Sequence, residues 1–251
     1  MSHKLDKFKA WFERLPSGEH LRAFTKSEAE TWLSARLEES GGKDIALLEQ
    51  LLNLYIRSHE TDKATRCIQR LMDLVDDRRA VSCLFLRLGQ IAEQINDYSS
   101  AEKFYRDSLA LGPPDEDVAY WVNNNLGYCL NVLGRPAEAE AYLKRAVELL
   151  PTRSNAFKNL ALCYQSLGRP VEAVEQFIAA THANAADPRS LALLEKMLEE
   201  QPELFGMVSD LHARLANCRM AVAQAQMMEP DFDGQWQKLR EKQEREKGDQ
   251  A

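Results

Sequence analysis

The sequence predicts an all-α fold, a solenoid of antiparallel helix pairs with helical caps at both ends. Two observations lead to this prediction: one pattern of residues recurs along the chain, and Gly-Arg-Pro breaks divide the clearest copies into two helices. These copies are NNLGYCLNVLGRPAEAEAYLKRAVELLP (124–151) and KNLALCYQSLGRPVEAVEQFIAATHANA (158–185). One helix pair cannot bury its apolar face alone, so successive pairs are expected to stack.

The period between these copies is 34 residues, because LGRP recurs at 133–136 and 167–170. An earlier copy at 86–113 is offset by 38 residues, which places four extra residues in the PPDED segment, and a weaker copy lies at 47–75. At these offsets the equivalent positions are Asn125 and Asn159, Leu126 and Leu160, Cys129 and Cys163, Ala101, Ala139 and Ala173, Tyr105, Leu143 and Phe177, and Ala146 and Ala180.

The breaks predict where each helix ends and begins. Gly134 and Gly168 are expected to end the first helix of a pair, since a residue in the left-handed region suits glycine. Pro136 and Pro170 then fall in the first turn of the second helix, where a missing N–H costs little. A coiled coil is excluded, because these breaks interrupt any sustained heptad pattern. The small residues expected where paired helices approach closely are Gly89, Gly127, Ala101, Ala139, Ala161 and Ala173.

The recurring pattern resembles the tetratricopeptide repeat (TPR) family, in which W-x2-L-G-x2-Y is followed by A-x3-F, A and P over about 34 residues. The resemblance covers residues 45–187 and is strongest over 82–187. It implies a right-handed superhelical solenoid whose first helices line a concave groove. The predicted organisation is an N-terminal helical cap (1–43), a TPR array (44–187) with repeats at 45–78, 82–115, 120–153 and 154–187, a C-terminal helical cap (188–228) and a charged tail (229–251).

Both ends of the chain carry amphipathic segments. An N-terminal apolar stripe is expected to cap the first repeat, or else to contact a membrane surface or a partner; it consists of Leu5, Phe8, Trp11, Phe12 and Leu15. A second helix is expected over 26–39, a third after Asp187 and Pro188 as N-cap and first residue, and a fourth from Pro202 through Val222. The methionines at 220, 227 and 228 fill this cap or form an adaptable binding surface.

Composition limits the classes of function. The 251 residues carry a net charge of −7, which argues against a general nucleic-acid binder. There is no run of about 18 apolar residues and no secretory signal, so we expect a cytoplasmic protein and, by default, no membrane partner. Five dispersed cysteines predict reduced, mostly buried thiols. Without GxSxG, HExxH, a P-loop or metal-ligand spacing, the sequence predicts no enzyme, no cofactor and no metal site.

The helical wheel predicts which residues line the groove. They are Arg87, Gln90 and Gln94 in the first clear repeat, Trp121, Asn124, Asn125, Tyr128 and Asn131 in the second, and Asn155, Lys158, Asn159, Leu162 and Gln165 in the third. An asparagine side chain offers one acceptor and two donors, so it is able to bridge the N–H and C=O groups of an extended peptide. Asn123 falls in the family's Trp slot and is expected to mark a loosened helix start.

Two binding modes of the family bear on this groove. Asn125 and Asn159 look like the asparagine ladder of O-linked N-acetylglucosamine transferases, which grips peptide backbones, although Arg87 fills the equivalent slot upstream. The carboxylate clamp for chaperone C-termini needs Lys and Asn, a further Asn, and then Lys and Arg. Only Asn125 matches that set, so chaperone-tail binding is disfavoured, while Lys158 remains able to pair with one acidic group on a ligand.

The sequence therefore predicts a non-enzymatic TPR adaptor or assembly scaffold that binds a peptide or protein segment in its concave groove. Two alternatives stay open. One is a dedicated chaperone or assembly factor for a secretion or pilus system, and the other is a peripheral membrane scaffold anchored by the N-terminal amphipathic helix. The capping helices also offer a route to a homo-oligomer.

Overall fold

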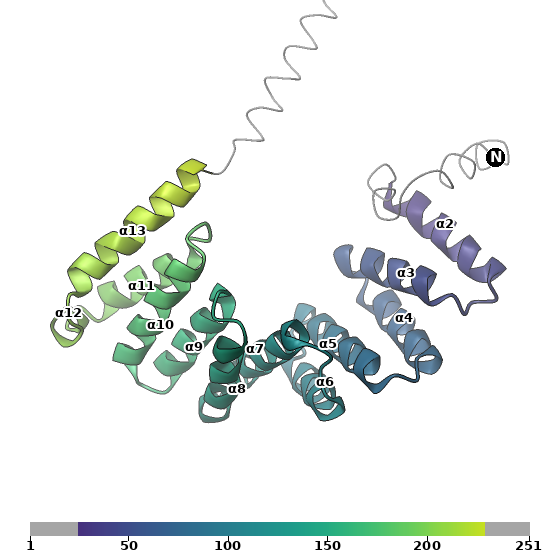
Figure 1. The fold of residues 1–251 in the computed structure, drawn as a ribbon, viewed down its shortest axis with the longest axis horizontal. Coiled ribbons are helices and arrows are strands. Elements are labelled where there is room, and N and C mark those ends of the chain that lie inside the picture. The colour runs from purple at the N-terminus through teal and green to yellow at the C-terminus, as the bar shows by residue number, and fades with distance from the viewer. Residues whose placement is uncertain (1–24, 229–251) are drawn as a thin grey trace, which may run out of the picture. The chain divides into compact units, whose positions relative to one another are not determined.

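The computed structural model describes residues 25–228, and every regular element in that range is a helix (Figure 1). The predicted N-terminal stripe of residues 5–15 and the charged tail of residues 229–251 lie outside the described residues. The chain divides within α7 into two compact parts, unit 1 (Met1–Cys129) and unit 2 (Leu130–Ala251). The helices are α2 (Lys26–Glu39), α3 (Ile45–Arg57), α4 (Thr61–Leu74), α5 (Arg78–Gln94), α6 (Tyr98–Leu111), α7 (Glu116–Val132), α8 (Pro136–Leu149), α9 (Ser154–Ser166), α10 (Pro170–Ala183), α11 (Arg189–Glu200), α12 (Leu204–Met207) and α13 (Leu211–Met228).

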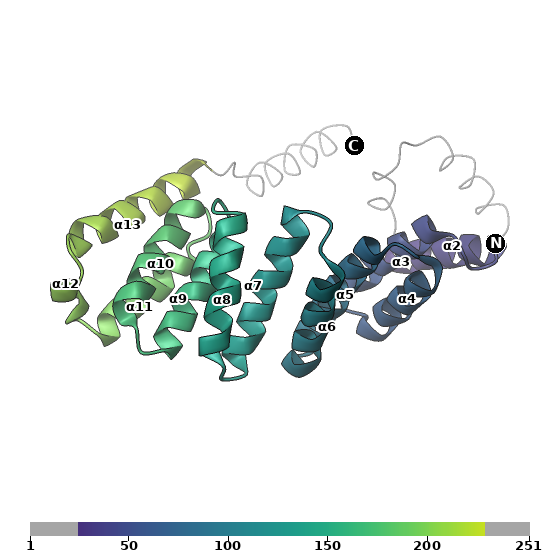
Figure 2. The same ribbon diagram turned by 60° about the horizontal axis from the view of Figure 1, so that its bottom comes forward.

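Each unit is built from antiparallel helix pairs, so the predicted all-α fold is confirmed. In unit 1, α3 packs on α4 and α5 on α6, while α2 covers α3 and α4 meets α5 (Figure 2). In unit 2, α9 packs against both α8 and α10, and α10 also contacts α11, α12 and α13. Short turns at 58–60, 95–97 and 167–169 reverse the chain and so bring consecutive helices together.

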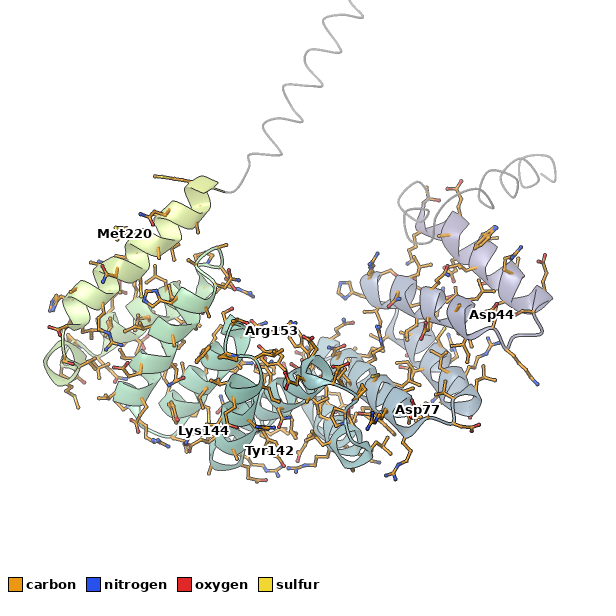
Figure 3. The ribbon with its side chains drawn as sticks, viewed as in Figure 1. Asp44, Asp77, Tyr142, Lys144, Arg153 and Met220 are labelled. Atoms are coloured by element: carbon orange, nitrogen blue, oxygen red, sulfur yellow. The ribbon has the colours of Figure 1, made fainter. Side chains whose placement is uncertain are left out.

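The turn residues adopt the backbone that the sequence predicts. Gly134 has a φ of 76° and Gly168 a φ of 67°, the left-handed region in which glycine meets no steric penalty. Pro136 and Pro170 are the first residues of α8 and α10. The side chains that cap α3, α5 and α6 by accepting a backbone N–H are Asp44, Asp77 and Asp97, of which Figure 3 labels the first two.

The cores of both units consist of aliphatic and aromatic side chains from facing helices. Leu33, Leu48 and Ile68 are fully buried in unit 1, as are Leu143 and Phe177 in unit 2. Burying one such side chain stabilises the fold by roughly 2 kcal/mol. The prediction of mostly buried thiols is confirmed, because Cys67, Cys129, Cys163 and Cys218 are buried and Cys83 is half-buried.

Gly89 allows α5 and α6 to approach each other closely. A Cβ atom at this position would lie 2.3 Å from Cε1 of Tyr105, whose side chain is fully buried. Any side chain at position 89 is therefore incompatible with the present position of the tyrosine ring. The prediction of small residues at helix contacts also holds at Ala101, Ala139, Ala161 and Ala173, which are fully buried.

The expected loosening of the helix start at Asn123 is wrong. α7 already begins at Glu116, where Asp115 Oδ1 accepts the backbone N–H of Val118 at 2.8 Å. Asn123 Nδ2 donates to the carbonyl of Ala119 at 2.8 Å, one turn earlier in the same helix. Glu116 and Asp117 of the acidic segment thus belong to α7, while residues 112–115 form the loop between α6 and α7.

The start of α11 also differs from the prediction. Pro188, not Asp187, is the residue that directly precedes this helix. Asp187 Oδ1 instead accepts the backbone N–H of Arg189 at 3.1 Å, so the carboxylate still caps the helix from one position further away.

The expected single helix from Pro202 onward is divided into α12 and α13. Asp210, between them, has a positive φ of 54°, which interrupts the helical backbone. Along α13, Met220 is 56% exposed and Met227 is 85% exposed. Figure 3 labels Met220 on this helix. These two methionines therefore form surface and do not fill the cap.

We expect Gly89→Ala to lower the free energy of unfolding by about 1–3 kcal/mol, because the added methyl group overpacks against Tyr105. Urea unfolding of the purified protein measures this change. Gly206→Ala is the matched control, since no atom lies within 4 Å of a Cβ added there. Equal losses of stability in the two variants would contradict the close approach of α5 and α6.

Candidate functional site

In unit 1 the asparagines of α7 belong to a chain of hydrogen bonds inside the protein. Asn124 Nδ2 donates to Asn125 Oδ1 at 2.9 Å, and Asn125 Nδ2 donates to the hydroxyl of Tyr105 at 3.3 Å. This hydroxyl donates in turn to Glu93 Oε1 at 2.7 Å, and Cys129 Sγ donates to the same oxygen at 3.4 Å. These five residues, which we call the Glu93 network, connect α5, α6 and α7.

The Glu93 network favours the protonated form of each of its titratable groups. Burial raises the pKa of Glu93, while hydrogen bonds from Tyr105 and Cys129 act in the opposite direction. Burial and then the Glu93 carboxylate raise the pKa of Tyr105, and the same two causes raise the pKa of Cys129. A thiol held in its protonated form is a poor nucleophile, so this network does not have the chemistry of an active site.

The helical wheel predicts a row of accessible amides on α7, but two of these amides are buried in the structure. Asn124 is only 3% exposed and Asn125 only 9% exposed. Trp121, Tyr128 and Asn131 are half-buried. The assignment of these five residues to a groove stays a prediction. The side chains of Asn124 and Asn125 form hydrogen bonds within the protein.

The half-buried aromatic residues of this set pack edge-on against tyrosines of unit 1. The ring of Trp121 lies 5.1 Å from that of Tyr120, and the ring of Tyr128 lies 6.0 Å from that of Tyr98, centroid to centroid. Asn131 Oδ1 is buried and accepts no hydrogen bond from the described residues. Among the predicted groove residues of α7, Asn131 thus has a side-chain oxygen without a hydrogen-bond donor in residues 25–228.

The predicted residues of α5 remain partly accessible. Arg87 Nη1 donates to Asn53 Oδ1 at 3.2 Å and so connects α5 with α3. Gln90 is half-buried and Gln94 is exposed. This part of unit 1 presents polar side chains to solvent, but its one cation already has a partner.

In unit 2 the predicted residues of α9 share one half-buried surface, which we call the α9 face: Asn155, Lys158, Asn159, Leu162 and Gln165. Lys158 Nζ donates to Asn155 Oδ1 at 3.4 Å. Burial lowers the pKa of Lys158, the charge of Arg189 lowers it further, and Asp187 acts in the opposite direction. The ammonium group is therefore desolvated beside a second cation.

Asp187 is engaged by Arg189 and not by Lys158. Arg189 Nε lies 2.8 Å from Asp187 Oδ1, and Nη2 lies 2.6 Å from Oδ2, which is a bidentate pair. This pairing lowers the pKa of Asp187 to about 2. The sequence analysis missed Arg189, because nothing in the repeat pattern places the start of α11 near α9.

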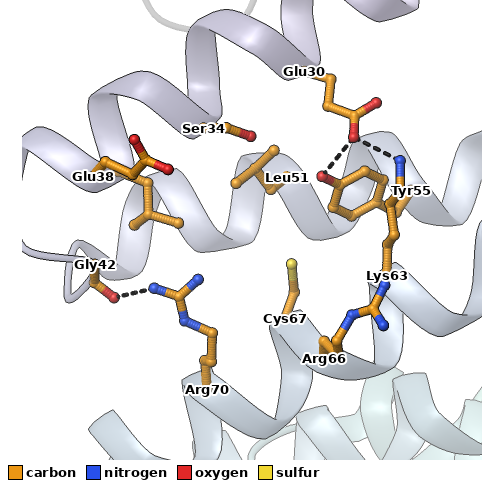
Figure 4. A pocket seen from close by; sticks show the side chains of 11 residues that line it. Glu30, Ser34, Glu38, Gly42, Leu51, Tyr55, Lys63, Arg66, Cys67 and Arg70 are labelled. Atoms are coloured by element: carbon orange, nitrogen blue, oxygen red, sulfur yellow. Dashed lines mark hydrogen bonds and ion pairs between the residues drawn. The ribbon is translucent and has the colours of Figure 1, made fainter.

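A second candidate site, also missed, is a cavity of about 350 Å³ between α2, α3 and α4 (Figure 4). Its charged lining residues are Glu30 and Glu38 from α2 and Lys63, Arg66 and Arg70 from α4. The spacing of three and four residues between the three cations places them on one face of α4, which is a signal that the sequence does contain.

Several polar groups of this cavity are already used within unit 1. Lys63 Nζ lies 2.7 Å from Glu30 Oε1, to which the hydroxyl of Tyr55 also donates at 3.1 Å. Burial and then Glu30 raise the pKa of Tyr55 to about 12. Arg70 Nη2 donates to the carbonyl of Gly42 at 2.7 Å. Bonds between the walls of the cavity thus occupy several of the groups that a ligand would need, which makes it the weaker candidate.

Residues 25–228 also lack two features that would point to other functions. No group of three His, Cys, Asp or Glu side chains in that range is arranged to hold a metal ion. Within the same range, no helix is both long enough and apolar enough to cross a bilayer.

Comparison with known sequences identifies the class of protein. Two tetratricopeptide repeat profiles match the chain, one over residues 84–119 and the other over residues 118–181. Human tetratricopeptide repeat protein 7B is 30% identical over 135 residues, which are 54% of this chain and 15% of that protein. Human protein O-mannosyl-transferase TMTC1 is 28% identical over 109 residues, which are 43% of this chain and 12% of that protein. The chain therefore spans only a small part of both relatives.

Solved structures show the same fold. PilW, a widely conserved type IV pilus biogenesis factor, has a TM-score of 0.61 and 20% identity, over 88% of this chain and 94% of PilW. YrrB, a TPR protein with an unusual peptide-binding site, has a TM-score of 0.54 and 21% identity, over 78% of this chain and 98% of YrrB. MamA from Desulfovibrio magneticus RS-1 has a TM-score of 0.56 and 16% identity, over 74% of this chain and 97% of that chain.

The chain thus contains tetratricopeptide repeats, which the two profiles recognise over residues 84–181. Proteins of this class are generally non-enzymatic scaffolds for protein–protein interaction. The fold assigns the class, and the identity of any partner depends on the chemistry of particular side chains.

Glu93→Gln tests the charge state of the Glu93 network. The pKa of Glu93 in the folded protein lies above the ordinary value of 4.5, so the folded state binds this proton more tightly than the unfolded chain does. The stability that protonation provides is present below the unfolded-state pKa and is lost as the pH rises through the folded-state pKa. We expect wild type to lose stability relative to Glu93→Gln as the pH rises above about 4.5 and through the folded-state pKa.

Urea unfolding at several pH values measures this difference, and glutamine keeps an acceptor oxygen for Tyr105. Asp97→Asn is the control, because hydrogen bonds from Ser100 lower the pKa of Asp97 and its titration therefore falls below this range. The difference between wild type and this control should be constant over the same interval. A constant difference for Glu93→Gln as well would contradict the raised pKa.

Proposed function

We propose that the chain is a non-enzymatic adaptor or assembly scaffold that holds an extended protein segment, with the α9 face as the principal contact. The observation that carries this proposal is the contrast between two equivalent helices. The amides of α7 are buried in the Glu93 network, whereas all five residues of the α9 face keep part of their surface accessible. A segment placed on α9 therefore meets amide, ammonium and aliphatic groups together.

The chemistry of the α9 face suits a peptide backbone. Asn155 and Asn159 are one helical turn apart, and each amide is able to donate to a C=O group and accept from an N–H group. Each such hydrogen bond contributes about 1 kcal/mol net, and burial of an apolar side chain against Leu162 contributes about 2 kcal/mol. The sum, less the ordering of the segment, supports micromolar or weaker affinity.

The similar structures support a scaffold but do not choose among its uses. The similarity to PilW is consistent with the alternative of a pilus or secretion assembly factor. The similarity to YrrB is consistent with peptide binding. Both identities are close to 20%, so the common fold carries neither activity with it. The membrane-scaffold alternative depends on residues 1–15, which lie outside the described residues.

The outer side of α13 supports a second contact, between two copies of this chain. Arg214 and Arg219 pair inward with Glu175 and Glu195. An uncharged strip reduces the local like-charge repulsion between two molecules that each carry a net charge of −7. In an antiparallel pairing centred on Met220, the small side chain of Ala213 would face the large one of Met227. The exposed residues on this side of α13 carry no charge: Ala213, Ala216, Asn217, Met220, Ala223, Gln224 and Met227.

Asn155→Ala combined with Asn159→Ala tests the α9 face. We expect the affinity for a purified partner, first isolated by co-purification, to fall about 30-fold, because two lost hydrogen bonds contribute about 1 kcal/mol each. Isothermal titration calorimetry measures the affinity. Asn184→Ala, at the exposed end of α10, is the matched control. An unchanged dissociation constant in the double variant would contradict binding at the α9 face.

Met220→Glu tests the α13 contact. Two facing carboxylates at the centre of the pairing repel each other, so we expect the dimer to dissociate at least tenfold more readily. Sedimentation equilibrium over a range of concentrations measures this change. Gln226→Glu adds the same charge to the same helix outside the strip and should have no effect. A wild-type protein that stays monomeric at all concentrations would exclude the α13 contact without affecting the α9 proposal.

A further inference from the structure

Among the described residues of unit 2, Lys158 forms no ion pair with a carboxylate. Eight other lysines and arginines of that part of the chain do form ion pairs: Arg135, Lys144, Arg145, Arg169, Arg189, Lys196, Arg214 and Arg219. Lys158 Nζ instead donates to a neutral group, the amide oxygen of Asn155, at 3.4 Å. An ammonium group has three donors, so this one long bond leaves its capacity largely unused.

The surroundings of Lys158 have an excess of positive charge. Asp187 is the acidic group that acts on Lys158, and both of its oxygens are already bound by Arg189. The Arg189 side chain is 69% exposed, and its Nη1 has no partner among the described residues. Two cations therefore share one carboxylate where α9 and the start of α11 meet.

A half-buried cation without a counter-charge is unfavourable in the free protein, because the ammonium group has lost part of its hydration. The lowered pKa of Lys158 agrees with this loss. A carboxylate brought by another molecule would compensate the charge, and the attraction is stronger at a partly desolvated site than in bulk water. The orientation of Asn155 helps, since its Oδ1 points to Lys158 and its Nδ2 has no partner among the described residues.

We infer that the α9 face recognises a carboxylate on the bound protein segment, with Lys158 pairing with one oxygen and Asn155 Nδ2 donating to the other. Arg189 adds attraction from the end of α11. The carboxylate belongs to an aspartate or glutamate side chain, or to the C-terminus of the segment. This inference rests on the proposed function and names the chemistry that selects the segment.

A library of random peptides on an array, in one set with free C-termini and in a second set with amidated ones, provides the test. Purified wild type should select peptides with an acidic residue from the amidated set, or should bind only the free C-termini, and the two sets distinguish these sources. Lys158→Gln should lose the preference. Lys144→Gln, which removes an equal charge from α8, should keep it.

The decisive measurement is a double-mutant cycle with the best amidated acidic peptide, followed by fluorescence anisotropy. Replacing the acidic residue of the peptide by its amide should weaken binding to wild type about tenfold and should have no effect on binding to Lys158→Gln. When a free C-terminus is selected instead, amidation of that terminus is the change to make. Lys158→Arg keeps the charge and should retain the difference, so the inference stays testable if the glutamine variant does not fold.

The two proposals fail in different ways. If wild type selects peptides without any carboxylate, or if the loss on removing it is the same in wild type and Lys158→Gln, recognition by Lys158 is refuted and peptide binding remains. If wild type binds no peptide in either set, the proposed function is refuted and this inference with it.

Discussion

The contact between Tyr105 and Gly89 is the constraint on which the middle of unit 1 depends. The tyrosine ring lies where a side chain at position 89 would be, so α6 sits against the backbone of α5. At this distance the hydroxyl reaches both Glu93 on α5 and Asn125 on α7. A shift of the ring by the size of a methyl group would move the hydroxyl away from both partners, because packed interiors transmit such changes. One missing side chain thus positions three helices.

The same contact explains why equivalent asparagines have different surroundings. In the repeat, the counterpart of Tyr105 in unit 2 is Leu143, and the counterpart of Asn125 is Asn159. Leu143 is fully buried like Tyr105 but has no hydroxyl to offer. Tyr105 offers Asn125 a hydroxyl as a hydrogen-bond partner in the interior, and Leu143 offers no such group at the equivalent place. The same polar position of the repeat can therefore be bonded inside the protein or lie at the surface. The residue that the preceding helix places beside it decides between the two.

The periodic features were predictable from the sequence, and the features that depend on two helices at once were not. The LGRP breaks predicted the positive φ angles of Gly134 and Gly168, since glycine at a helix end is a local requirement. A helical wheel gives only the direction of Asn125, and not the hydroxyl from α6 that binds it. The break at Asp210 is likewise absent from the pattern, because a positive φ in a non-glycine residue is imposed by tertiary packing.

The surroundings of Arg189 and Lys158 also depend on two helices at once, and the repeat pattern does not predict them. Lys158 was expected to be accessible, from its position on α9, but its lack of a carboxylate partner depends on how Arg189 binds Asp187. No alignment of the repeats contains that information, since Arg189 lies beyond the last repeat, as the first residue of α11.

Glu93 and Lys158 together show what separates a polar cluster that stabilises the fold from one suited to a ligand. Glu93 is a buried carboxylate without a cation, yet a hydroxyl and a thiol of the same unit donate to it. Its needs are met inside the protein, and the chain of hydrogen bonds ends there. Lys158 has an incomplete set of partners, a neutral acceptor at 3.4 Å and a neighbouring cation. Residue type does not make this distinction, because both side chains are ionisable and half-buried. Completeness of hydrogen bonding does, and by that criterion Lys158 on α9 is the residue suited to a ligand.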